Sequence, residues 1–339
     1  GQANIIYVGE GLNASVAVSE LSNGVRNYHN AGKVQASSEP QDMRLQRMLG
    51  HLTTLLPNTG ASINKQNVLV IGCGAGVTAG AVSISPALER ETIAEIEPLV
   101  PSVVSKYFGE HNYNVVTNPK VHVQIDDARH FILTTDQKFD AVTSDPLDPW
   151  VKGAATLYTQ EFFEVVKSKL KPGGVVTLFV QLYESNTEAV KSEVATFMKA
   201  FPNGVVFSNT NNGAGYDLVL VGQQGDTPIK IDVDAVEKRL ASPEYAQVAQ
   251  SLREIGFNSA TDLFATFAGN EPMLRPWLAD AQINHDRNLR LQFLAGLGLN
   301  IYDQAGIYSQ MLQYRRYPEG MFTGTQEQIG RIRMGTGGF

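Results

Sequence analysis

Residues 68–78, Val-Leu-Val-Ile-Gly-Cys-Gly-Ala-Gly-Val-Thr, decide the fold of this chain. Four apolar residues in a row predict a short buried strand, and the glycines that follow predict a tight turn leading into a helix. The nicotinamide dinucleotide fingerprint requires Gly-x-Gly-x-x-Gly or Ala, but Val77 stands at its third position. The spacing of Gly72, Gly74 and Gly76 instead fits S-adenosylmethionine-binding folds, and a purely structural turn is the alternative.

Strand and helix patterns alternate from about residue 66 onward. This alternation is typical of a parallel sheet with helices on both faces. Helices are expected between the first five strands, and the last two strands are expected to form an antiparallel hairpin at the sheet edge. The predicted strands cover residues 67–71, 91–96, 121–125, 139–144, 174–180, 203–208 and 217–221.

The pattern divides the chain into three predicted regions. Residues 1–60 hold β-hairpins followed by a helix, and residues 61–225 form a Rossmann-like α/β core of the S-adenosylmethionine-methyltransferase type. Residues 226–339 are expected to be a helical extension with a flexible, glycine-rich tail. In that extension the apolar spacing predicts helices at 233–240, 245–255, 260–266 and 288–313.

Composition narrows the classes of partner. The chain of 339 residues has a net charge of −7, which argues against binding nucleic-acid phosphates.

One cysteine, Cys73, excludes an intrachain disulfide and a cysteine metal cluster. No apolar run is long enough to span a bilayer, and the absence of an initiator methionine at Gly1 predicts a processed chain or a piece of a longer one.

Acidic residues follow two further predicted strands. Glu95 ends the second strand, where a carboxylate can accept hydrogen bonds from both ribose hydroxyls. Asp127 ends the third, where it can accept from an adenine amino group, and Ala128 leaves room for the ring. Either acid could instead cap a helix. Their position beside the glycine turn, at one edge of the predicted sheet, favours a nucleoside site.

A second pair of acids follows the fourth strand, in the segment Ser-Asp-Pro-Leu-Asp-Pro-Trp at residues 144–150. Asp145 and Asp148 could hold an amine and take its proton, because an amine attacks carbon only as the free base. The alternative is that both acids cap the following turn, since Asp-Pro is a common turn former.

Taken together, these segments resemble the spermidine synthase-like aminopropyltransferases, and within them a divergent branch often fused to membrane-transporter-like segments. The resemblance covers residues 14–225, with a weaker similarity to about 293. It rests on residues 30–37, 68–78, 95–98, 125–129, 144–150 and 157–159.

The resemblance implies a small N-terminal β-region, a methyltransferase-like core and a homodimer. It assigns the adenosine contacts to Glu95 and Asp127, makes Asp145 the group that helps to deprotonate the attacking amine, and matches Asp148 to a carboxylate at the amine end. The implied donor is decarboxylated S-adenosylmethionine.

The amine half of the site agrees with the family pattern at two positions and departs from it at several others. Gln35 and Gln181 fall where the family has polar residues near the pocket. Ala75 stands where the family has an acid that anchors the aminopropyl group, residues 45–48 replace a Tyr-His-Glu-Met segment, and residues 209–215 replace a loop containing Tyr-Pro. The departures put both putrescine as acceptor and decarboxylated S-adenosylmethionine as donor in question.

The sequence therefore predicts an enzyme of polyamine-biosynthesis type that moves an aminopropyl or related alkyl group to a small amine and releases methylthioadenosine. The alternatives are an S-adenosylmethionine-dependent methyltransferase and a non-catalytic adenosyl-nucleoside-binding domain of a membrane protein. The co-substrate is decarboxylated S-adenosylmethionine or S-adenosylmethionine, and no metal is expected. We expect a cytoplasmic protein, or one at the cytoplasmic face of a membrane if the chain comes from a membrane-attached parent.

Overall fold

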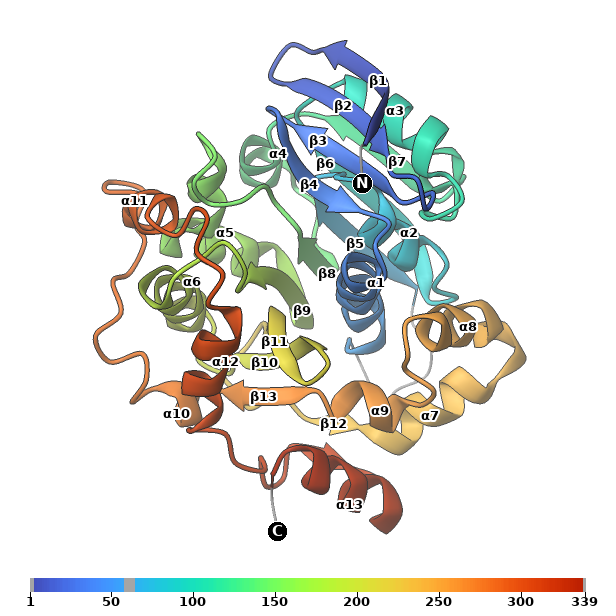
Figure 1. Cartoon of the computed structure of the whole chain (residues 1–339). Coiled ribbons are helices and arrows are strands. Elements are labelled where there is room, and N and C mark those ends of the chain that lie inside the picture. Colours follow the sequence, from blue (N-terminus) through green and yellow to red (C-terminus); the bar gives the residue numbers. More distant parts are fainter. Residues whose placement is uncertain (1–2, 58–64, 338–339) are drawn as a thin grey trace.

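The computed structural model describes residues 3–57 and 65–337. At the N-terminus, the chain folds into a small antiparallel sheet that lies at the top of Figure 1. The predicted boundary at residue 60 and the end of the predicted tail, residues 338–339, lie outside the described residues. The strands of this sheet pair in sequence order: β1 (Asn4–Glu10), β2 (Ser15–Glu20), β3 (Arg26–Asn30) and β4 (Lys33–Ser37).

The body of the molecule is built on one mixed sheet, with strand order β13-β10-β11-β9-β8-β5-β6-β7 over the described residues. The strands from β7 to β9 pair in parallel, whereas β11, β10 and β13 add antiparallel pairs. The strand bounds are β5 (Gln66–Ile71), β6 (Leu88–Glu95), β7 (Val121–Ile125), β8 (Phe139–Ser144), β9 (Leu170–Gln181), β10 (Val205–Asn211), β11 (Ala214–Gln223) and β13 (Phe267–Asn270).

The order of the parallel strands reverses at β5, which pairs with β6 on one side and with β8 on the other. In open α/β sheets, ligands bind at such a switch point, outside the carboxyl ends of the strands. Strand β5 is almost entirely buried because helices cover both faces of the sheet, and its apolar run is typical of a central parallel strand.

Helices cover the sheet in two layers (Figure 1). Side chains of α1, α2, α3 and α7 to α9 join one apolar core, and those of α4, α5, α6, α11 and α12 join the other. The helix bounds are α1 (Pro40–Leu55), α2 (Val77–Ser83), α3 (Leu99–Phe108), α4 (Ala128–Thr134), α5 (Gln160–Lys169), α6 (Thr187–Ala200), α7 (Val233–Ala241), α8 (Ala246–Glu254), α9 (Ala260–Phe264), α10 (Glu271–Leu274), α11 (Arg290–Gly296), α12 (Gln304–Leu312) and α13 (Gln326–Gly335).

The small sheet is fixed to the body through α3 and the residues before it. Arg26 Nη1 donates to the carbonyl oxygen of Tyr107 at 2.6 Å, and the backbone N–H of Asn13 donates to Glu97 Oε2 at 2.7 Å. The rings of Tyr7 and Tyr107 pack with centroids 5.6 Å apart. These contacts hold β3 and β4 over the carboxyl edge of the parallel strands.

The region after residue 225 differs from the predicted helical extension. Strand β13 pairs with the outer side of β10, so the expectation that the β10–β11 hairpin forms the sheet edge was wrong. Two short strands, β12 (Ile231–Asp232) and β14 (Phe322–Thr323), also pair with each other. The helix predicted over 288–313 is divided into α11 and α12. Within the described residues, no helix combines the length and apolar character needed to cross a membrane.

Candidate active site

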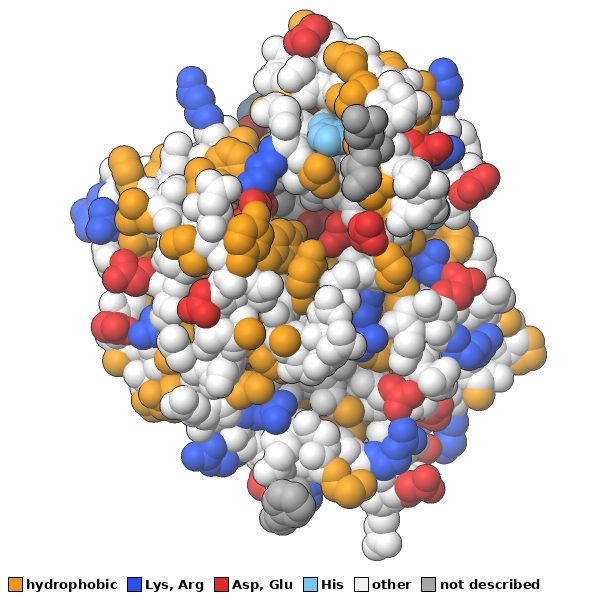
Figure 2. All heavy atoms as spheres, viewed as in Figure 1, with side chains coloured by type: hydrophobic (Ala, Val, Ile, Leu, Met, Phe, Trp, Pro, Cys, Tyr) orange, Lys and Arg blue, Asp and Glu red, His pale blue; other side chains and the backbone are white. Residues whose placement is uncertain are grey.

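A cavity of about 220 Å³ lies between the small sheet and the carboxyl ends of the parallel strands. Figure 2 shows the hollow, with acidic side chains at its rim and within it. Its walls come from β3 and β4 above, from the ends of β5, β6 and β8 below, and from the segment after β8. The lining residues are Tyr28, Asn30, Gln35, Ala36, Ile71, Gly72, Gly74, Ala94, Glu95, Ile96, Asp127, Ala128, Asp145, Pro146, Leu147, Asp148, Lys152, Gly153, Ala154, Thr156, Leu157 and Phe179.

The glycine turn forms one wall of this cavity. Gly72, Gly74 and Gly76 have φ values of 80°, 50° and 79°, which side-chain-bearing residues rarely adopt. Gly72 and Gly74 line the cavity. Gly76 does not line it: a Cβ there would lie 2.8 Å from Asn112 Nδ2, so this glycine allows close packing at the start of α2.

Glu95 ends β6 beside the turn and is held by two backbone amides. Oε2 accepts from the N–H of Cys73 at 2.8 Å, and Oε1 accepts from the N–H of Glu97 at 2.8 Å. Burial raises the pKa of this carboxyl, and the backbone hydrogen bonds oppose that rise. Because the backbone fixes both oxygens, their remaining lone pairs point in set directions and can accept from a diol.

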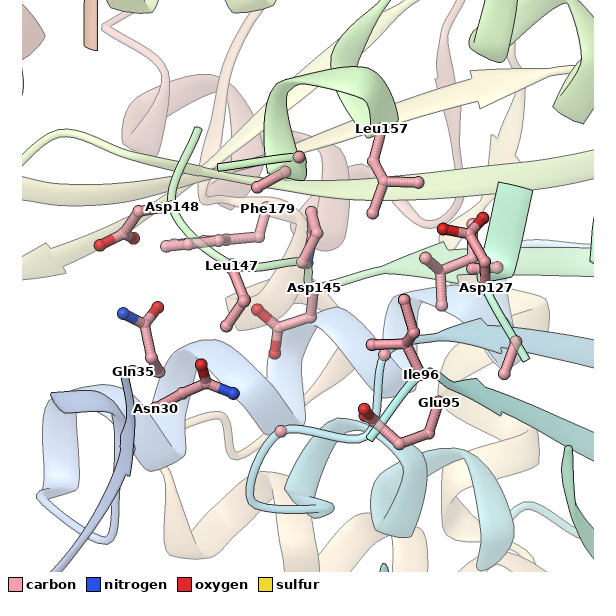
Figure 3. Close-up of a pocket in the computed structure, with 18 of the residues that line it drawn as sticks. Asn30, Gln35, Glu95, Ile96, Asp127, Asp145, Leu147, Asp148, Leu157 and Phe179 are labelled. Carbon is pink, nitrogen blue, oxygen red and sulfur yellow. The ribbon is translucent and has the colours of Figure 1, made fainter. Parts of the chain in front are cut away.

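Asp127 both caps a helix and lines the cavity. Its Oδ1 accepts from the N–H of His130 at 2.9 Å, so it is the N-cap of α4. It also lines the cavity, together with the buried Ala128. In Figure 3, Asp127 and Glu95 lie toward the same end of the cavity. Two carboxylates and a small residue there can hold a flat, polar ring and its sugar.

Asp145 lies in the middle of the cavity, between that end and Asp148 (Figure 3). Its Oδ2 accepts from Thr78 Oγ1 at 3.0 Å. Burial raises its pKa from 3.8 to about 6, and the nearby carboxylates of Asp42 and Asp148 add to the rise. At neutral pH the group is therefore a carboxylate, with a higher proton affinity than an exposed aspartate.

Asp148 lies at the end of the cavity opposite Asp127, close to Gln35 (Figure 3). Burial raises its pKa to about 6, the ammonium of Lys33 lowers it, and the carboxylate of Glu184 raises it. The two aspartates and these neighbours make this end of the cavity suitable for a cationic amine.

The small sheet supplies cavity residues that the motifs did not reveal. Asn30 and Tyr28 of β3 line the cavity, and Asn30 Nδ2 donates to Tyr28 Oη at 3.3 Å. Phe179 of β9 and Leu157 add apolar walls. Gln35 was predicted near the pocket by the resemblance, and it does line this wall.

Several positions that the resemblance linked to the amine pocket lie elsewhere. Leu45 and Ala75 are buried in the apolar core, and Arg47 Nη1 pairs with Glu254 Oε2 at 2.6 Å. Gln181 is buried beyond Phe179 on the same face of β9, and neither it nor these three residues line the cavity. The wall facing Asp145 and Asp148 therefore comes from the small sheet rather than from α1.

The fold and the cavity define the class of this protein. A glycine turn after the first strand, a carboxylate at the end of the second and a cavity at the switch point form a Rossmann-like, methyltransferase-type α/β fold. Spermidine synthase in complex with the transition state analogue AdoDATO has this fold, with a TM-score of 0.66 and 20% identity over 81% of this chain and 88% of that one. Spermidine synthase from Thermotoga maritima aligns with a TM-score of 0.64 at 20% identity, over 81% and 87% of the two chains.

Sequence comparison identifies the family. The spermine/spermidine synthase domain matches residues 42–210. Polyamine aminopropyltransferase 1 of Pseudomonas aeruginosa is 29% identical over 46% of this chain and 54% of its own length. The polyamine aminopropyltransferase of Klebsiella pneumoniae is 34% identical over 42% of this chain and 48% of its own. The chain belongs to the spermidine synthase-like family, and it spans about half the length of these curated relatives.

Proposed function

We propose that this protein transfers an aminopropyl group from decarboxylated S-adenosylmethionine to a small amine. The observation that carries the proposal is the order of acids along one cavity: Glu95 and Asp127 at one end, Asp145 in the middle, and Asp148 at the other end. Diol and adenine acceptors at one end and an amine-binding pair at the other suit a nucleoside donor and an amine acceptor.

The residues present fit the donor. Glu95 would accept hydrogen bonds from the ribose hydroxyls and Asp127 from the adenine amino group, with Ala128 and the side-chain-free turn at Gly72 leaving room for the ring and sugar. The donor's sulfonium and ammonium would face Asp145 and the negative end of the cavity. S-adenosylmethionine itself carries a carboxylate that these acids repel, so the cavity favours the decarboxylated form.

The chemistry requires one proton acceptor. As the amine nitrogen bonds to the aminopropyl carbon, the carbon–sulfur bond breaks and its electron pair stays on sulfur, which leaves as neutral methylthioadenosine. The nitrogen then carries an extra proton, which the carboxylate of Asp145 takes. Thr78 holds this carboxylate in place, and Asp148 orients the amine for in-line attack.

The family supports this proposal over the alternatives. The relatives are named polyamine aminopropyltransferases. Binding a nucleoside alone would not require the acids at the amine end of the cavity. A methyltransferase shares the fold, but its donor brings the carboxylate that Asp145 and Asp148 disfavour. The homodimer, the cytoplasmic location and the membrane-attached parent chain remain predictions.

Calorimetric titration tests the donor. The proposal predicts that decarboxylated S-adenosylmethionine and methylthioadenosine bind at least about tenfold more tightly than S-adenosylmethionine, because only the last brings a carboxylate to the acidic end. Tighter binding of S-adenosylmethionine than of its decarboxylated form would instead favour methyl transfer.

A further inference from the structure

A lysine of the small sheet lies near Asp148, at the proposed amine end of the cavity. Lys33 begins β4 and pairs across the sheet with Asn30, which lines the cavity, so these two side chains lie on the same face of the small sheet. Gln35, two residues farther along β4, also lines the cavity, whereas Lys33 is not one of the lining residues. Figure 2 shows basic and acidic side chains side by side at the rim of the cavity.

Three groups from the body of the molecule surround the ammonium of Lys33. Its Nζ lies 2.5 Å from Glu184 Oε2 and 4.8 Å from the centroid of the Trp150 ring. It is also close enough to Asp148 to lower the pKa of that carboxyl. Two carboxylates and an aromatic face form the usual protein site for an organic cation.

Glu184, the carboxylate that pairs with Lys33, is held in place by its own neighbours. Glu184 follows β9 and has a φ of 47°, an unusual conformation for a residue with a side chain. Its Oε1 accepts from Tyr302 Oη at 3.1 Å, and its neighbour Ser185 forms a β-bridge with Tyr302. One oxygen of this carboxylate is therefore held by Tyr302 and the other by Lys33.

We propose that Lys33 determines which amines are accepted, by filling the cation position beside Asp148 that the second ammonium of a diamine would otherwise take. This inference rests on the proposed function, because it concerns the acceptor in that reaction. The acceptor is then a primary amine with a neutral or anionic far end. Asp145 serves its reacting nitrogen, and its far end meets Lys33.

Electrostatics gives the direction of the selection. A diamine must place its second charge next to Lys33 or displace that ammonium from Glu184, and both are unfavourable in a partly buried site. An amine with a carboxylate at its far end would instead gain an ion pair with Lys33. Replacing Lys33 by methionine keeps most of the side-chain volume, removes the charge and frees Glu184 and Asp148 for the second ammonium.

The test is calorimetric and needs no turnover. Protein saturated with methylthioadenosine is titrated with 1-aminobutane, 1,4-diaminobutane and 4-aminobutanoate, first as wild type and then as Lys33→Met. We expect the wild type to bind 4-aminobutanoate most tightly and the diamine most weakly. In the variant, the ratio of the dissociation constants of diamine to 4-aminobutanoate should fall by about tenfold or more.

A lysine of similar surroundings provides the control. Lys191 Nζ lies 2.9 Å from Asp280 Oδ1 and 5.7 Å from the centroid of Trp277, away from the cavity, so Lys191→Met removes a comparable set of contacts. That variant should keep the wild-type order of affinities. The inference is overturned if the ratio is the same in Lys33→Met and wild type, if it also changes in Lys191→Met, or if none of the amines binds. Failure of methylthioadenosine to bind at all would instead refute the proposed function.

Discussion

Replacing Asp145 by asparagine is expected to lower activity and raise stability at the same time. The amide cannot take the proton that the attacking nitrogen releases, and a general base typically contributes a factor of 10² to 10⁴ in rate. The shape of the side chain and its ability to accept from Thr78 Oγ1 are retained. Binding of methylthioadenosine should therefore change little while kcat falls by about 10² or more.

The expected gain in stability follows from the pKa of the same group. Folding raises that pKa from 3.8 to about 6. A raised carboxyl pKa means that the group's contribution to stability is complete below the unfolded pKa and is lost as the pH rises through the folded value. Between these two pKa values the folded protein loses about 3 kcal/mol of stability, or about 1–2 kcal/mol after allowance for partial exposure of the Asp145 side chain. Asparagine has no charge to bury, so the variant should be more stable by that amount at pH 7.5.

Urea unfolding at several pH values, with kcat measured on the same preparations, tests both parts. The stability difference between variant and wild type should grow from pH 4 to pH 7 and then level off. Asp140→Asn is the control at the other end of β8, where Asp140 Oδ2 pairs with Lys171 Nζ at 2.8 Å. That change should lower stability and leave kcat intact. Wild-type kcat in Asp145→Asn would refute the assignment of Asp145 as the proton acceptor.

Three further outcomes are expected. With saturating substrates, kcat should rise through a limb centred near pH 6 as Asp145 loses its proton, and a profile that is flat from pH 5 to pH 8 would contradict this. Glu95→Gln should raise the calorimetric Kd of methylthioadenosine about tenfold to a hundredfold, because an amide cannot accept from both backbone N–H groups and from the ribose. Asp126→Asn, which changes a residue outside the cavity, should leave this Kd unchanged. Equal effects of the two substitutions would contradict the assignment of Glu95 to the ribose. Glu91→Met should raise the free energy of unfolding by about 1–2 kcal/mol at pH 7, because Glu91 is fully buried and neither carboxylate oxygen has a hydrogen-bond partner among the described residues. A lower free energy of unfolding in urea would contradict this prediction.

The parts of the site that could be predicted from sequence lie at the ends of parallel strands. Glu95 ends one parallel strand, Asp127 and Asp145 closely follow two others, and the carboxyl ends of such strands must meet at one edge. Local pattern and one topological rule therefore suffice to bring the three acids into one cavity. The end of the cavity that holds Glu95 and Asp127 needed no further information.

The amine end depends on contacts between distant segments. Tyr28 and Asn30 line the cavity only because the small sheet docks on α3, and no local periodicity records that docking. The resemblance linked the amine pocket to Leu45 and Arg47 on α1, yet α1 packs both residues away from the cavity.

Two errors in the C-terminal region also have physical causes. Strand β13 has only four residues, too few for a period of two to show, and it is defined by its pairing with β10. The helix predicted over 288–313 ends early because glycines and Asn300, with φ of 64°, interrupt it. Gly298 approaches Ser185 so closely that a Cβ would lie 2.7 Å from its Cα. The glycines were a usable signal, but the apolar spacing around them outweighed it.

Product analysis tests the central proposal most directly. The wild-type protein is incubated with decarboxylated S-adenosylmethionine, labelled with ¹³C in the aminopropyl group, and with an amine panel that includes monoamines, diamines and amino acids. Mass spectrometry should detect methylthioadenosine in equal amount to an amine that has gained the labelled aminopropyl group, and Asp145→Asn should form both at about a hundredth of the wild-type rate or less. Formation of S-adenosylhomocysteine from unlabelled S-adenosylmethionine, or nucleoside binding without either product, would contradict aminopropyl transfer.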